Sequence, residues 1–143
     1  MPGRILLLVL VLAASLLPAR ANLGETVEQL VVRYGKPTGY AEASAKSPFG
    51  SLLFRVRPYE LVLFILNNHE VGARVSKIDK SDFSPVEMQT IIDAETGVGP
   101  WVLTPSSDST EIHWTRGDHA TFIYDKQKHM LLLTSDAMAQ ALR

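Results

Sequence analysis

The sequence predicts an α+β fold, in which short helices pack on antiparallel β-meanders. Short apolar runs of strand-forming residues occur in two groups, and turn residues separate the runs within each group. Two helix starts carry capping boxes, one ahead of each group. Strand runs grouped apart from helices are typical of antiparallel α+β domains rather than of parallel α/β folds.

The first 21 residues have the pattern of a secretory signal peptide. Arg4 is followed by 13 residues, 5–17, that are mostly apolar, and then by Pro18 and the small-x-small step that ends at Ala21. A membrane-spanning helix needs about 20 apolar residues, which makes a retained anchor the weaker alternative. We expect cleavage after Ala21 and export to the periplasm or out of the cell. A single domain over 22–143 follows, and since the chain has no Cys, we expect no lipid anchor.

Charge and cysteine content exclude several classes of function. Without Arg4 and Arg20 the remaining chain has 12 basic and 15 acidic residues, a net charge of about −3. Nucleic acid is therefore not an expected partner. The absence of Cys rules out disulfides, cysteine nucleophiles and cysteine-ligated metals. A chain of this length can bury enough apolar surface to fold as one domain around one core.

Residues 24–37 are predicted to form the first helix. Thr26 and Gln29 fit a capping box, and Gly35 and Pro37 end the helix. The apolar residues between them recur at helical spacing: Val27, Leu30, Val31 and Tyr34. The following segment, 38–47, alternates only weakly, so an edge strand and an ordered loop remain equal alternatives.

The stretch 52–78 contains three strand-like runs, 52–57, 61–66 and 71–78, joined by two turns. The simplest pairing places one apolar set on the core face: Leu53, Val62, Phe64, Leu66, Val71, Ala73 and Val75. It places a second apolar set on the opposite face: Leu52, Phe54, Val56, Leu61, Leu63 and Ile65. Because antiparallel sheets usually have one dry face and one wet face, this second face is expected to need a cover, either from this chain or from a partner.

The second half of the chain repeats the order of helix and meander. Ser84, Pro85 and Glu87 are typical of a helix start, and this helix is expected to end near residue 94 or 95. An extended piece at 101–103, a hairpin of 111–116 with 120–124, and a strand at 129–133 follow. Ser135 is expected to cap a final helix over 136–142.

No pattern in the sequence identifies a catalytic or metal site. His113, Asp118 and His119 lie close in sequence, and imidazole and carboxylate are normal zinc ligands, but their spacing fits no ligand motif. No serine lies in a G-x-S-x-G elbow. The acidic residues around the second helix, Glu95 among them, are expected to be solvated. We therefore predict no catalytic residue, no metal and no cofactor, and keep a small hydrolase or metal-dependent enzyme built on His113, Asp118 and His119 as the alternative.

The opening helix resembles that of a known family. Its segment GETVEQLVVRYGKP, with Gly24, Thr26, Leu30, Gly35 and Pro37, is similar to the first helix of small exported bacterial proteins of the SmpA/OmlA type. The β-lactamase-inhibitor proteins have a similar plan of a helix followed by a meander. The resemblance implies an envelope protein that binds other proteins. This chain departs from the family in lacking the lipid-anchoring Cys and in its greater length, and no functional residue transfers to it.

The leading functional prediction is a non-catalytic exported binding or assembly module that binds protein through a sheet face or edge. It rests on residues 61–66, which are apolar on both sides. The predicted binding residues are Phe54, Leu63, Ile65, Trp101 and Trp114. A self-associating structural protein is the other alternative, with another envelope protein or a second copy as the partner.

Overall fold

The computed structural model describes residues 22–143, and the predicted signal peptide lies outside the described residues. Its helices are α2 (Val27–Tyr34), α3 (Pro85–Ala94) and α4 (Asp136–Ala141). Its strands are β1 (Gly39–Ala41), β2 (Gly50–Val56), β3 (Tyr59–Leu66), β4 (His69–Lys77), β5 (Val102–Thr104), β6 (Glu111–Thr115), β7 (Thr121–Asp125) and β8 (Met130–Thr134). The α+β fold class is confirmed.

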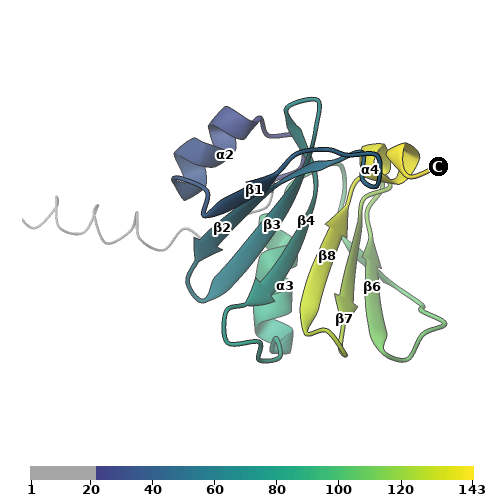
Figure 1. The fold of residues 1–143 in the computed structure, drawn as a ribbon. Helices are drawn as coiled ribbons and strands as arrows, with labels where there is room; N and C mark the ends of the chain where they lie inside the picture. Colours follow the sequence, from purple (N-terminus) through teal and green to yellow (C-terminus); the bar gives the residue numbers. More distant parts are fainter. Residues whose placement is uncertain (1–21) are drawn as a thin grey trace, which may run out of the picture.

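All eight strands belong to one antiparallel sheet, in the order β1-β2-β3-β4-β8-β7-β6-β5. Each half of the chain forms a four-stranded meander, and the last strands of the two meanders, β4 and β8, pair with each other (Figure 1). The two short strands β1 and β5 therefore form the outer edges of the sheet. Segment 38–47, for which strand and loop were equal alternatives, contains the three-residue strand β1.

The predicted helix caps are confirmed. Both capping boxes form: Thr26 with Gln29 at α2, and Ser84 with Glu87 at α3. The hydroxyl of Ser135 accepts from an amide in the first turn of α4. These bonds satisfy amide groups that a helix start would otherwise leave without partners. None of these helices is long and apolar enough to cross a bilayer.

The predicted faces of the first meander are confirmed for its first two runs but are wrong for Ala73 and Val75, because a β-bulge puts these two residues on the other face, which is the core face. Between β3 and β4 the register shifts at Phe64 and Ile65, because Val71 is an extra residue in β4. A one-residue shift exchanges the two faces of a strand, so Ala73 pairs with Leu63 and shares its face. The core face consists of Leu52, Phe54, Leu61, Leu63, Ala73, Val75, Phe122, Tyr124, Leu131 and Leu133.

Two helices cover this core face. Leu30 of α2 and Ile91 and Ile92 of α3 belong to the same buried cluster as the strand residues, and α3 lies behind the middle of the sheet in Figure 1. On the opposite face, α4 covers only one end, where Met138 packs with Phe49 and Val71. The cover that the sequence required is thus supplied by the chain itself, on the face that contains Phe54 and Leu63.

Candidate functional site

A row of paired residues crosses all eight strands through the middle of the face away from α2 and α3. We call this row the open row: Gly39, Leu53, Val62, Arg74, Leu132, Ile123, His113 and Thr104, in order from β1 to β5. Its four aliphatic side chains are half-buried and Arg74 is exposed. The aliphatic residues therefore form two apolar pairs that solvent can reach, Leu53 with Val62 and Leu132 with Ile123, one on each side of Arg74.

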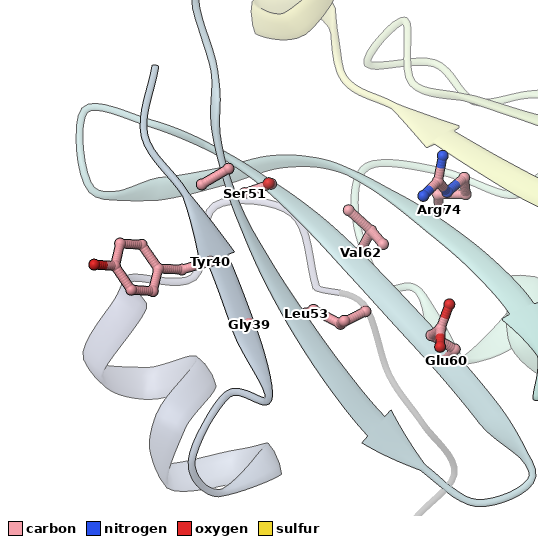
Figure 2. Close-up of a pocket in the computed structure, with 8 residues that line it drawn as sticks. Gly39, Tyr40, Ser51, Leu53, Glu60, Val62 and Arg74 are labelled. Carbon is pink, nitrogen blue, oxygen red and sulfur yellow. The ribbon is translucent and has the colours of Figure 1, made fainter. Parts of the chain in front are cut away.

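The β1 side of the open row is hollowed into a pocket of about 360 Å³. The residues that line it come from the first four strands: Gly39, Tyr40, Ala41, Ser51, Leu53, Glu60, Val62 and Arg74. Figure 2 shows Leu53 and Val62 in the middle of this surface, Glu60 and Arg74 farther in along the sheet, and Tyr40 pointing outward at the edge. Because Gly39 has no side chain, the edge strand leaves Leu53 accessible from this side.

Two charged residues line this pocket, and only one of them, Glu60, is in an ion pair within the described part of the chain. Glu60 lies 3.4 Å from Arg55 and 3.6 Å from Lys80, so its charge is compensated. Within residues 22–143, Arg74 takes part in no ion pair. The open row thus offers an uncompensated guanidinium between Val62 and Leu132, which suits a ligand with apolar groups on either side of a carboxylate.

The residues predicted to bind a partner lie elsewhere. Phe54 and Leu63 are 1% and 0% exposed, inside the core. Ile65, Trp101 and Trp114 are partly buried and pack against the same core cluster. The open row consists of other residues. The signal that could have revealed Ile123 and Leu132 was that each lies within an unbroken apolar run, which puts apolar side chains on both faces of its strand.

The histidine and acidic residues of the enzyme alternative have separate partners. Asp118 accepts two hydrogen bonds of 2.8 Å from Arg116, and these bonds lower the pKa of its carboxyl. The Nε2 of His113 lies 2.7 Å from Glu111, and His119 has a positive φ of 65° in the β6–β7 turn. Among residues 22–143, no three His, Asp or Glu side chains are arranged to hold a metal ion. Asp118 serves to fix its turn and the buried Arg116.

Comparisons with known proteins show similarity of fold only. No family model matches the chain, and no curated protein matches it. A cysteine-rich secretory protein of Staphylococcus aureus aligns over 81% of this chain with a TM-score of 0.51 and 14% identity. An extracellular protein containing a SCP domain, from Bacillus anthracis, aligns over 83% with a TM-score of 0.50 and 10% identity. The chain spans less than half the length of either protein, 45% and 46%.

Proposed function

We propose that this chain is a non-catalytic exported binding module that holds an extended segment of another exported protein against the open row. The observation that carries the proposal is the accessible apolar row around Arg74, on a face that α2 and α3 leave uncovered and that α4 covers only at one end. An apolar strip with one central charge fits a segment that has a carboxylate between apolar side chains. The apolar contacts contribute most of the binding free energy, and the charge pair fixes the register.

Three observations support the exported setting. The signal-peptide pattern of residues 1–21 favours export. The resemblance of residues 24–37 to the SmpA/OmlA type favours a protein-binding role in the bacterial envelope. Two proteins of similar fold are described as secretory and extracellular, respectively. Together they support an exported protein as the partner.

Val62→Asp is expected to reduce partner binding about tenfold or more, because it places a second charge in the middle of the apolar surface. Val62 is half-buried on the open row and contributes nothing to the core cluster, so the chain should still fold. The measurement is capture of exported proteins by the immobilised chain, quantified by mass spectrometry, with folding monitored by circular dichroism.

Val32→Asp is the matched control. Val32 is 88% exposed on α2, outside the open row, so the same change there should leave capture unchanged. Equal capture by the Val62→Asp and unmodified chains would contradict the proposal. Sedimentation of the same proteins tests the predicted self-association: a wild-type dimer that Val62→Asp dissociates would identify the partner as a second copy of this chain.

A further inference from the structure

Two buried glutamates and one partly buried glutamate lie beside the first described residues of the chain. Glu70 at the start of β4 is 1% exposed, Glu95 at the end of α3 is 3% exposed, and Glu25 precedes α2. Both carboxylate oxygens of Glu70 and one oxygen each of Glu95 and Glu25 are buried without a hydrogen-bond partner. Buried carboxylates without partners are costly, and a cation bound beside them would lower this cost.

Residues 22–27 are fixed against this site by backbone bonds. The amide of Gly24 donates to the carbonyl of Glu70, and the amide of Glu70 donates to the carbonyl of Glu25, both at 2.8 Å. The amide of Leu23 donates to Oε1 of Glu95 at 2.9 Å, across 72 residues of sequence. The start of the domain is therefore held beside the two most buried carboxyl groups.

The neighbouring cations do not neutralise Glu70 or Glu95. Arg33 forms an ion pair with Glu25. When the side-chain amide of Asn22 is oriented with its oxygen toward Arg33, this oxygen accepts from both terminal nitrogens of Arg33, at 3.2 and 3.1 Å. Arg116 forms its ion pair with Asp118. Its hydrogen bond to Glu95 goes to the backbone carbonyl and not to the carboxylate.

Two further polar groups border the site. His69 lies 2.9 Å from the carbonyl of Gly24, and the buried hydroxyl of Tyr34 has no partner. Burial, with the neighbouring carboxyl charges, raises the pKa of Glu70 to about 9, and burial raises that of Glu95 to about 7. The site therefore favours the arrival of a positive charge.

We propose that this site binds the α-ammonium group that is created at Asn22 when the signal peptide is removed. The proposal rests on the predicted cleavage after Ala21 and is independent of the open row. Asn22 directly precedes Leu23, whose amide is already bonded to Glu95. The Cα atoms of these two residues are about 3.8 Å apart, so the nitrogen of Asn22 lies close to the same carboxyl group. In the unprocessed chain this nitrogen is a neutral amide. After cleavage it is a cation with three donors, placed beside carboxylate oxygens that have no partner.

The consequence is that removal of the signal peptide stabilises the folded domain. The test compares two forms of the domain, since every helix, every strand and both apolar clusters of the described chain lie within 22–143. One form begins at Asn22, and the other carries two alanines ahead of Asn22, which move the ammonium group away. At pH 6.5 the form that begins at Asn22 should have a Tm about 3–8 °C higher. An ammonium group held by carboxylates has a raised pKa, so this advantage persists from pH 6.5 to about pH 8 and is lost as pH rises through that pKa.

A double variant, Glu70→Gln with Glu95→Gln, separates the ion pair from other effects of the extension. The Gln carbonyl at position 95 can still accept from Leu23, but neither Gln carries a charge, so the Tm difference between the two forms should fall below about 1 °C. Equal Tm values in the wild-type background, or a difference that survives the double variant, would overturn the proposal. So would N-terminal sequencing of the exported protein that finds a first residue other than Asn22. Capture through the open row is a separate measurement, so either proposal can fail alone.

Discussion

Leu63→Asp is expected to leave no stably folded chain. Leu63 is 0% exposed and lies between Leu52 and Ala73 on the core face of the sheet. The change removes a buried leucine side chain and places a carboxylate in an apolar core, a combination that costs more than about 4–5 kcal/mol. Since domains of this size are stable by about 5–15 kcal/mol, most of the folded population should be lost. Urea denaturation followed by circular dichroism measures the effect.

Phe54→Asp should act in the same way, because Phe54 lies on the same face at 1% exposure. The matched control is Val32→Asp, which should change the free energy of unfolding by less than about 0.5 kcal/mol. If Leu63→Asp gave a folded chain of wild-type stability that had lost only its partner, the assignment of the core face would be wrong. Leu63 would then belong to a binding surface.

Glu70→Gln is expected to stabilise the chain at pH 7 by about 3 kcal/mol. The pKa of Glu70 is about 9 in the folded chain against an ordinary value of 4.5. An acid with a raised folded pKa binds more protons in the folded state, so its contribution to stability is lost as pH rises from about 4.5 to about 9. At pH 7 the pH lies about 2.5 units above the ordinary pKa of 4.5, and each unit costs the folded state about 1.36 kcal/mol. Gln removes this cost because it stays neutral.

Urea midpoints measured from pH 4.5 to pH 9 test this prediction. The wild-type midpoint should fall across the window, and the Glu70→Gln midpoint should stay flatter, with the two proteins close together at the acid end. A free ammonium group at Asn22 would lower the pKa of the neighbouring carboxyls. The pH range over which the wild-type midpoint falls would then end below pH 9. Glu42→Gln is the control, since Glu42 is exposed. Parallel pH profiles for the wild type and Glu70→Gln would show that Glu70 is not the group responsible.

Local patterns in the sequence predicted most of the elements. The capping boxes at Thr26 and Ser84 determine the start of α2 and α3 through side-chain bonds within one turn, so they can be recognised without knowledge of the rest of the fold. The strands follow from short apolar runs between turns. The joining of β4 to β8 depends on contacts between distant halves of the chain, and nothing local determines it.

The faces of the first meander could not be predicted in the same way. The simplest pairing across the β3–β4 turn places Val62 and Ala73 on one face. The β-bulge at Val71 reverses this and brings Ala73 to Leu63. The open row becomes visible only with this register and with the pairing of the two meanders.

The buried acidic site was missed for a related reason. Glu70 follows a polar turn and Glu95 lies at the end of a helix, two places where carboxylates are usually solvated. The segment 22–27 packs over both, through the amides of Leu23 and Gly24. Such burial by a remote segment is a tertiary effect that composition and spacing do not reveal.

Site-specific photo-crosslinking in the exporting cell tests the binding proposal most directly. A photo-reactive phenylalanine analogue replaces Val62 on the open row in one protein and Val32 on α2 in another, both of them accessible valines. We predict a discrete crosslinked product with one exported protein from position 62 and none from position 32. Products of equal yield from both positions, or a product from position 32 alone, would contradict the assignment of the open row as the binding surface.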